Sequence, residues 1–490
     1  MTHVVIVGGG NAAFAAAVSA RDSGADVTLL ERAPEALRGG NSRFTAGAMR
    51  VVYDGIADLR KLMPDLTDTE VARTDFGEYS SASFYEDLGR VTNWRCDPEL
   101  AAHLVEESLP TLLWMRGHGL RFLPLYGRQS FEVEGRVRFW GGLTVEAWGG
   151  GPGLIDGWTA IAKHAGVRVH YDTRAIGIAT AGGSISGVHV RAQGREEIIT
   201  ADRVVLASGG FEANPAWRAR YLGPGWDLAR VRGTRFNTGD GIDMALAIGA
   251  AARGHWSGCH AVGWDLNAPE FGDLEVGDAF QKHSYPLGIM INARGQRFVD
   301  EGADFRNYTY ARYGGEILAQ PNQFAWQVFD AKVIPLLRDE YRIRRITHVE
   351  ADDLQTLVKR MENVDAREFL DTVTQFNAAV DTSVRFDPSV KDARAARGLQ
   401  VPKSNWANTI DTPPFHAYGV TCGITFTFGG LAVDAQARVL DEAGAPIAGL
   451  FAAGELVGGL FYHNYPGGTG LTSGAVFGRT AGRNAAAMRA

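Results

Sequence analysis

The N-terminal segment constrains the fold of this chain more than any other part of the sequence. His3–Val7 (HVVIV) is apolar enough for a strand buried on both faces, and the run Gly8-Gly9-Gly10-Asn11-Ala12-Ala13 follows it directly. The alanine-rich stretch Ala12–Ser23 predicts a helix that Gly24 ends, and Asp26–Leu30 predicts a second strand. The chain therefore begins with a β-α-β unit that turns through glycines.

The spacing Gly8-x-Gly10-x-x-Ala13 is typical of a dinucleotide-binding turn. Gly8 permits the tight turn, Gly10 lets a pyrophosphate approach the backbone, and the small Ala13 lets the helix pack close to the strand. The helix N-terminus adds free N–H groups and a positive potential. Glu31 ends the second strand, where a carboxylate accepts hydrogen bonds from ribose hydroxyls. We therefore expect a bound dinucleotide cofactor.

Five later glycine-rich segments favour FAD as that cofactor: 39–42, 207–210, 238–241, 449–455 and 467–472. Segment 39–42 is a small, polar loop of the kind that lies against a flavin ring, and backbone N–H groups at 467–472, where a helix is expected to begin, can stabilise negative charge on a reduced flavin. The chain has no second dinucleotide fingerprint, which argues separately against a nicotinamide-dependent enzyme. The predicted cofactor-binding residues are Gly8, Gly10, Asn11, Ala12, Glu31, Arg32, Gly40, Asn41, Ser42, Ala46, Gly47, Ala207, Ser208, Gly209, Asp240, Gly454, Glu455, Gly470 and Leu471.

Composition limits the other classes of partner. The formal net charge is −7 and no basic run stands out, which argues against nucleic acid. Cys96, Cys259 and Cys422 are far apart and lack metal-ligand spacing, so we expect neither a disulfide nor a metal site.

Nothing in the sequence predicts secretion or a membrane span. The N-terminus lacks the features of a signal peptide, so we expect a cytoplasmic protein. Two stretches without charged side chains, Thr412–Val433 and Leu456–Gly478, approach membrane-spanning length. Both are rich in Gly and Thr and contain proline, so we interpret them as walls of a cofactor pocket.

The periodicity along the 490 residues predicts two domains. Val167–Leu206 alternates as a β-meander that returns to the parallel sheet, and Gly239–Ala252 has a helical pattern. Residues 255–410 are more polar and aromatic, with a charged helical stretch at 351–382. We expect an α/β fold: a Rossmann-like FAD-binding domain with a parallel sheet and β-meander (1–254 and 411–490, with a mainly helical segment at about 51–150), and an inserted α+β capping domain (255–410).

These motifs resemble the flavoprotein family of fumarate reductases and succinate dehydrogenases, which includes 3-ketosteroid dehydrogenases. The likeness covers nearly the whole chain and is greatest to the tricarballylate dehydrogenase branch. It rests on the Gly-Gly-Gly-Asn-Ala-Ala opening, Gly39-Gly40-Asn41-Ser42, Phe298–Arg306 and Asn464–Leu471. The resemblance implies an enzyme that dehydrogenates a CH–CH bond next to a carboxylate or carbonyl, of the type that converts tricarballylate to cis-aconitate.

The resemblance also implies roles for individual residues. Arg306 matches the arginine that transfers a proton, and His260 matches a histidine that binds a substrate carboxylate. Tyr465 resembles the tyrosine that binds a ketone in ketosteroid dehydrogenases, and His463 lies in the same segment. Phe426 and Tyr465 stand where fumarate reductases carry a carboxylate-binding histidine and arginine, respectively, so a plain fumarate site is not expected. Arg43 or its neighbour replaces the histidine of covalent flavin attachment, which implies non-covalent FAD.

The expected reaction moves a hydride from one carbon to flavin N5 and a proton from its neighbour. Arg306 is a difficult base, since a guanidinium pKa near ~13 makes its neutral form cost roughly 8 kcal/mol at pH 7. Glu301 and Asp304 are candidates for a relay that lowers this cost. Arg128, Arg136 and Arg138 are either further substrate-binding cations or surface residues.

Two other functions stay open at this point. One is a ketosteroid-type or other enone dehydrogenase or reductase. The other is a flavin subunit that relays electrons without catalysis. The chain has no haem or iron–sulfur motif, so a separate electron acceptor is expected, and the tricarballylate branch implies a membrane-associated electron-transfer partner.

Overall fold

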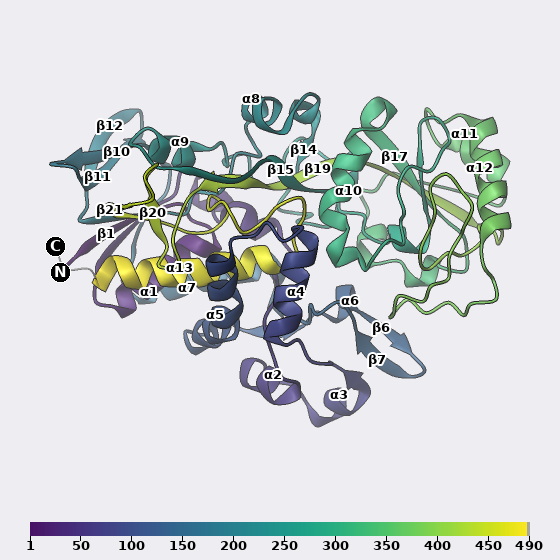
Figure 1. Cartoon of the computed structure of the whole chain (residues 1–490), viewed down its shortest axis with the longest axis horizontal. Helices are drawn as coiled ribbons and strands as arrows, with labels where there is room; N and C mark the ends of the chain where they lie inside the picture. The colour runs from purple at the N-terminus through teal and green to yellow at the C-terminus, as the bar shows by residue number, and fades with distance from the viewer. Residues whose placement is uncertain (488–490) are drawn as a thin grey trace.

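The computed structural model describes residues 1–487 and has two parts (Figure 1). One part is built on a six-stranded sheet in the order β20-β21-β13-β1-β2-β9, in which β20 (Arg438–Leu440) pairs antiparallel and the other strands pair parallel. Its strands include β1 (His3–Val7), β2 (Asp26–Leu30), β9 (Arg168–His170), β13 (Arg203–Leu206) and β21 (Pro446–Ala452). The predicted β-α-β opening and parallel sheet are therefore confirmed.

Two helices from opposite ends of the chain cover this sheet. α1 (Asn11–Asp22) packs against α13 (Thr469–Ala487), the yellow helix in the left half of Figure 1. A Cβ added to Gly478 would lie 2.4 Å from the carbonyl oxygen of Ala12, and one added to Gly482 would lie 2.1 Å from that of Ala16. The small residues of both helices therefore allow the backbones to touch, and they bring the C-terminal segment to the N-terminal glycine turn.

The predicted β-meander is present as an antiparallel sheet of β10 (Thr173–Ala181), β11 (Ser184–Ala192) and β12 (Arg195–Thr200). The mainly helical interpretation of 51–150 is right only for the first part, which forms α2 (Ile56–Leu62), α3 (Asp68–Arg73), α4 (Ser81–Val91) and α5 (Pro98–Gly117). After Gly117 the chain forms short strands, among them β5 (Phe122–Pro124), β6 (Ser130–Val133), β7 (Arg136–Phe139) and β8 (Val145–Ala147). These pair with each other and with β3 (Ala48–Met49) and β4 (Thr74–Asp75).

The second part holds the elements expected for the cap (Figure 1, right). They include β16 (Ile289–Asn292), α10 (Tyr310–Leu318), β17 (Phe324–Phe329), β18 (His348–Ala351), α11 (Leu354–Arg360) and α12 (Ala366–Ala379). Phe369, Phe376 and Trp326 anchor its own apolar core. The charged stretch at 351–382, predicted to be helical, contains the two helices α11 and α12.

Two long antiparallel strands connect the parts. β15 (Ala252–Asp265) pairs with β19 (Phe415–Leu431) through most of its length, and β19 continues into the cap sheet beside β17. The helix expected at 239–252 is shorter, α9 (Asp240–Leu246), because the chain enters β15 at Ala252. The predicted boundaries at 254/255 and 410/411 remain predictions, and the first falls inside β15.

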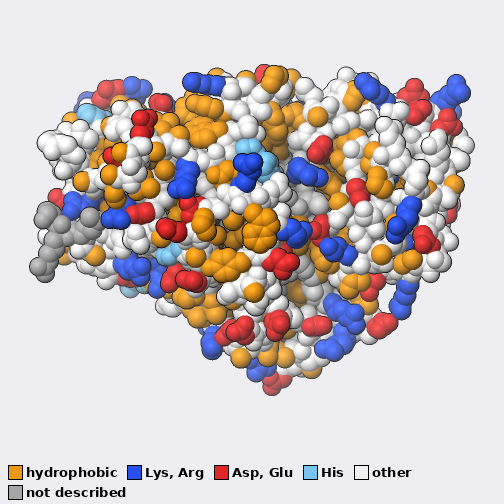
Figure 2. Space-filling view, viewed as in Figure 1, with side chains coloured by type: hydrophobic (Ala, Val, Ile, Leu, Met, Phe, Trp, Pro, Cys, Tyr) orange, Lys and Arg blue, Asp and Glu red, His pale blue; other side chains and the backbone are white. Residues whose placement is uncertain are grey.

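The surface and the helices add two observations. Within residues 1–487, no helix has both the length and the apolar character that a membrane span needs. On the face drawn in Figure 2, basic and acidic side chains are interspersed among the described residues.

Candidate functional site

A long cavity runs from the N-terminal glycine turn to the junction between the cap and the FAD-binding domain. Its free volume, including the mouth, is about 1850 Å³. Every residue predicted to bind the cofactor lines it except Gly47. Thr425–Phe428 and several residues of 454–474 also line it, as expected for the two uncharged stretches. Segments more than 400 residues apart in the sequence thus form one continuous wall.

Gly47 has a packing role instead. Its φ is +76°, and a Cβ there would lie 2.8 Å from the backbone of Gly150, at the start of α7 (Gly150–His164). Gly47 is therefore required by the close approach of two backbones, and its predicted contact with the cofactor is not supported by its position.

The glycine turn at one end of the cavity fits a pyrophosphate. Gly8 has φ +120°, and a Cβ there would lie 2.2 Å from the carbonyl oxygen of Ala207. Asn11 begins α1 and fixes the helix start, because its Nδ2 donates to Leu471 O (2.8 Å) while its backbone N–H donates to Ser42 Oγ (3.1 Å). The turn, the helix N-terminus and α13 are thereby held in one arrangement.

Glu31 lies beside the turn with one carboxylate oxygen engaged. Its Oε1 accepts a hydrogen bond from Ala33 N at 2.7 Å, and burial raises its pKa against the opposing effect of that bond and of Arg32. Arg32 is paired with Asp240 (3.0 Å), which also pairs with Arg174 (2.8 Å). Both predicted residues of this pair line the cavity, where they close its polar end.

Glu455, a predicted cofactor ligand, lines the cavity and pairs with a second carboxyl group, that of Glu212, which the sequence did not single out. Glu455 accepts from Thr427 N (2.9 Å), and the buried Glu212 accepts from Asn41 Nδ2 (2.6 Å) and Asn237 Nδ2 (2.7 Å). The two carboxyl groups interact, and burial raises the pKa of each. We expect this pair to hold a proton at neutral pH, because two adjacent buried carboxylates repel each other.

The donor set fits FAD. One end offers helix N–H groups and a buried carboxylate, which suit a pyrophosphate and a ribose. Ser208 Oγ lines the cavity and is buried without a partner among the described residues. A buried hydroxyl of this kind calls for a ligand, since an unsatisfied polar group is costly.

The other end of the cavity carries the predicted substrate residues. His260, on β15, is 1% exposed, and neither ring nitrogen has a partner among the described residues. Its ring lies between those of Tyr310 (4.9 Å), Tyr465 (4.8 Å) and Phe426 (5.2 Å). Burial, with a smaller effect of Arg232, lowers the pKa of His260 well below its ordinary value, so the imidazole is neutral.

Arg306 faces the same cavity and contacts a second histidine. Its Nη1 lies 3.2 Å from His283 Nδ1, and its Nη2 donates to Arg128 O (2.7 Å) and Gln129 Oε1 (2.8 Å). Its Nε is buried and unpartnered in the described structure. Burial is the largest influence on Arg306, and the net effect lowers its pKa. The guanidinium is thus oriented by three acceptors while one N–H remains for a ligand.

The expected relay residues are engaged elsewhere. Glu301 forms a buried ion pair with Arg297 (2.5 Å) and accepts from Met290 N (2.8 Å), and Asp304 pairs with Arg90 and Lys391. His283, which no sequence motif indicates, occupies the position next to Arg306. Its Nε2 is buried without a partner in residues 1–487, and its pKa is lowered well below the usual value by burial first and by Arg306 second.

Two more arginines and one aspartate complete the polar wall. Arg128 forms a two-point pair with Asp278 (both distances 2.9 Å), and Arg232 lies 3.7 Å from the same carboxylate. Arg232 Nε is another buried, unpartnered donor of the described chain. Among the residues that line this end of the cavity, these two arginines and Arg306 accompany one carboxylate, that of Asp278, so the lining itself has an excess of positive charge. Glu340 and Glu146, which do not line the cavity, offset part of that charge from behind the wall. Arg136 and Arg138 do not line the cavity.

Aromatic side chains also line this end of the cavity. Tyr465 contacts the rings of Phe426 (5.1 Å) and Phe461 (5.5 Å), and its hydroxyl makes a short hydrogen bond with that of Tyr310. Burial raises the pKa of Tyr465 well above its ordinary value, so the phenol is protonated and can donate.

His463 is displaced from this site. It is exposed, has φ +61°, and contacts His255 rather than the cavity. The position of His463 does not support its expected role as a substrate ligand, because the tight turn that buries Tyr465 turns His463 outward.

The cap carries one His/Glu group that spacing alone did not reveal. His348, Glu350 and His416 lie on the paired strands β18 and β19, with ligand-type atoms within 4.8 Å of one another. The two imidazoles share a hydrogen bond of 2.9 Å.

Comparison with known proteins agrees with this geometry. Residues 3–471 match the model of the family described as "FAD binding domain". A probable fumarate reductase of Shewanella frigidimarina is 29% identical over 497 residues, which cover 99% of this chain and 75% of that protein. The 4-oxocyclohexanecarboxylate 2-dehydrogenase of Sinomonas cyclohexanicum is 27% identical, with coverage of 99% and 93%.

Solved structures show the same fold. The open conformation of a flavocytochrome c3 fumarate reductase superposes with a TM-score of 0.73 at 28% identity, over 99% of this chain and 78% of that one. From the family match, the matching fold and the cavity, we conclude that the chain belongs to the FAD-binding flavoprotein family that includes the fumarate reductases, and that it is an FAD-dependent oxidoreductase.

Proposed function

We propose that the protein dehydrogenates, or in reverse reduces, a carbon–carbon bond next to a carboxylate. The observation that carries this proposal is the excess of positive charge on the cavity wall, where Arg306 and Arg232 each keep a free buried N–H group. Such donors bind carboxylates strongly in a dry site. The finer proposal is a substrate with several carboxylates, of the tricarballylate type.

The names of the relatives support the reaction class. Fumarate and 4-oxocyclohexanecarboxylate are both acids whose reaction is at a carbon–carbon bond, and the proteins with those names resemble this chain over nearly its full length. FAD, bound non-covalently, would accept or return the hydride.

The chain's own residues would bind the acid and move the proton. Arg232 and the neutral His260 are placed to hold a carboxylate, and Arg306 is placed to transfer the proton of the neighbouring carbon. The lowered pKa of Arg306 reduces the cost of its neutral form. His283 shares a hydrogen bond with Arg306 and replaces Glu301 and Asp304 as the group through which a proton would pass.

A second candidate is a ketone or enone substrate, as in ketosteroid dehydrogenases. The aromatic wall favours it, because Phe426, Phe461 and Tyr465 present an apolar surface with one buried phenol as a donor. A separate electron acceptor, a membrane-associated electron-transfer partner and a cytoplasmic location belong to the same proposal and follow from the resemblance alone.

The test is an anaerobic titration of the FAD-loaded protein with tricarballylate, succinate, citrate and a 3-ketosteroid. We expect tricarballylate to bleach the flavin absorbance near ~450 nm rapidly. Arg306→Gln should slow the bleaching by about 10²–10⁴-fold, the usual contribution of a positioned proton-transfer group, while FAD stays bound. Arg312→Gln is the matched control, since Arg312 forms an exposed pair with Glu316 (3.7 Å).

Each other outcome excludes a part of the proposal. Bleaching by the ketosteroid alone would select the second candidate. Bleaching by none of the compounds, with normal reduction by dithionite, would favour a flavin subunit that relays electrons. Equal rates in Arg306→Gln and wild type would remove Arg306 from the reaction.

A further inference from the structure

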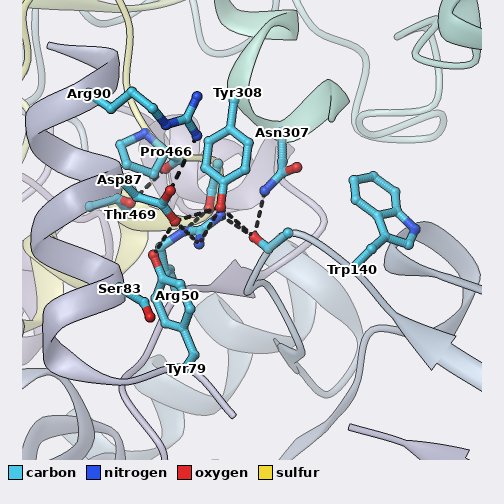
Figure 3. Close-up of polar contacts among 12 residues, drawn as sticks. Arg50, Tyr79, Ser83, Asp87, Arg90, Trp140, Asn307, Tyr308, Pro466 and Thr469 are labelled. Atoms are coloured by element: carbon cyan, nitrogen blue, oxygen red, sulfur yellow. Dashed lines mark hydrogen bonds and ion pairs between the residues drawn. The ribbon is translucent and has the colours of Figure 1, made fainter. Parts of the chain in front are cut away.

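A buried cluster around Arg50 lies behind the cavity wall. Arg50 follows β3, and its side chain is 0% exposed. Figure 3 shows it surrounded by Tyr79 and Asp87 from the segment that leads into and forms α4, and by Tyr308 from the cap. Asp87 Oδ2 accepts hydrogen bonds from Tyr308 (2.5 Å) and Tyr79 (2.6 Å) and lies 3.5 Å from Arg50 Nη1.

The cation of Arg50 is permanent in these surroundings. Burial alone would lower its pKa, but the oxygens of Tyr79, Tyr308 and Asp87 outweigh that effect and raise it. The guanidinium also lies over the rings of Tyr79 (5.0 Å) and Tyr308 (5.3 Å). Burying an arginine so completely is expensive, so its fixed position calls for an explanation beyond packing.

The donors of Arg50 reach the backbone of the cavity wall. Nε donates to Gly467 O (2.9 Å), Nη2 donates to Gly141 O (3.0 Å), and the backbone N–H donates to Gly468 O (3.2 Å). Gly467 and Gly468 line the cavity, while Arg50 does not. Arg50 therefore acts on the cavity only through these peptides.

The Gly467–Gly468 peptide transmits the charge toward the cavity. A trans peptide is planar, so its N–H points opposite to its C=O. The C=O of Gly467 accepts from Arg50, so the N–H of Gly468 points away from Arg50, and both glycines line the cavity together with Tyr465. A hydrogen bond accepted by a peptide C=O and one donated by its N–H polarise one another in a medium of low dielectric constant.

The same cluster holds the turn that carries Arg306. Tyr308 O accepts from Asn464 Nδ2 (2.5 Å), and Asn307 O accepts from Gly467 N (2.9 Å). Asn307 Nδ2 and Arg50 Nη2 donate to the same oxygen, that of Gly141. A Cβ on Gly142 would lie 2.3 Å from the Tyr79 ring, so the loop needs glycine to approach the cluster.

We propose that Arg50 and Asp87 are positioning residues for the flavin reaction. They fix the Gly467–Gly468 peptide and the Arg306 turn relative to each other, and through that peptide they set the electrostatic potential in the cavity. The positive charge of Arg50 stabilises negative charge in the cavity, and the negative charge of Asp87 partly cancels this effect.

The test measures the midpoint potential of the bound flavin by dithionite titration, which needs no substrate and so does not depend on the proposed reaction. Arg50→Gln removes the cation and should lower the potential. Asp87→Asn keeps an oxygen acceptor for both tyrosines, removes the negative charge that Asp87 presents to Arg50 (3.5 Å) and Arg90 (3.2 Å), and should raise the potential. We expect the ratio of reduced to oxidised flavin at a fixed potential to change about tenfold in each direction.

Arg60→Gln and Asp68→Asn are the matched controls, because this ion pair is 44% and 94% exposed at its two side chains. Both should leave the potential unchanged. Arg50→Lys retains the charge and should restore the potential toward wild type. Potentials equal to wild type in Arg50→Gln and Asp87→Asn, with only the melting temperature reduced, would overturn the proposal. If Arg50→Gln does not fold, the midpoint potential of Asp87→Asn decides: a rise supports the proposal, and a wild-type value overturns it.

Discussion

Single residues set the charge at the end of the cavity that holds Arg306, where two buried histidines are neutral. His260 and His283 are within 2% of complete burial, and arginines face both. A protonated imidazole in that place would add to the repulsion among Arg128, Arg232 and Arg306. The two neutral imidazoles thus provide hydrogen-bonding groups without adding positive charge beside the arginines.

This arrangement predicts a pH-dependent stability. The pKa of His260 is lowered by burial, so below about pH 6.5 the unfolded chain binds a proton that the folded chain does not, and stability falls as the pH falls. At pH 5.5 the loss is about 1.4 kcal/mol for one histidine relative to pH 7.5. In urea unfolding of the FAD-loaded protein, the free energy of unfolding of His260→Gln should fall between pH 7.5 and pH 5.5 by about 1.4 kcal/mol less than that of the wild type.

The control for this prediction is His164→Gln, since His164 is exposed at the end of α7. It should reproduce the wild-type pH dependence. An unchanged pH dependence in His260→Gln would show that this imidazole does not stay neutral in the folded protein.

The sequence singled out His260 and Arg306 by resemblance, and both reach the cavity. It passed over Arg232 and His283, because neither lies in a glycine motif or a recognisable spacing. Arg232 reaches the wall through a short pairing of β14 (Arg230–Val231) with β19, a contact between segments about 190 residues apart. His463 shows the reverse case, in which the correct segment presents a different side chain, that of Tyr465.

At the scale of elements, the turn between β1 and α1 is the most tightly specified part of the fold. Gly8 must have positive φ, and its Cα lies against the end of β13. We expect Gly8→Ala to retain no FAD, because the methyl group would displace Ala207 and the turn together. Bound FAD per chain, measured after purification, checks this prediction.

Gly24→Ala is the corresponding control. Gly24 also has positive φ (+84°), but a Cβ there would meet nothing within 4 Å. It should bind FAD fully and lose only about 1 kcal/mol of stability. Full FAD content in Gly8→Ala would mean that the turn can move without loss of the cofactor site.

Local patterns predicted the elements whose pairing partners are near or whose faces are strongly apolar. The β-α-β opening and the β-meander belong to this group. The strands β5 to β8 were missed because they have three or four residues each and pair partly with β3 and β4. A strand that short carries too few residues for its alternation to be visible.

At the scale of the whole molecule, the two parts share both a cavity and a pair of strands. Residues of the FAD-binding part and of the cap line the same space, and β19 belongs to both. We therefore expect calorimetry to show one unfolding transition that FAD shifts upward. At a free FAD concentration of 100 times its Kd, the gain is about 2.7 kcal/mol. Two transitions, of which FAD moves only one, would contradict this coupling.

The pairing of β15 with β19 is irregular at two places, between His255 and Cys259 and between His260 and Ala261. Residues 256–258 have no partner in the register, between the pairs His255–Phe428 and Cys259–Thr427. A bulge removes ladder hydrogen bonds and lets a strand bend. His260 therefore lies between two irregular sections of the strand pair that joins the two parts of the molecule. A bend of the cap relative to the other part at either section would tilt the imidazole of His260 within the cavity.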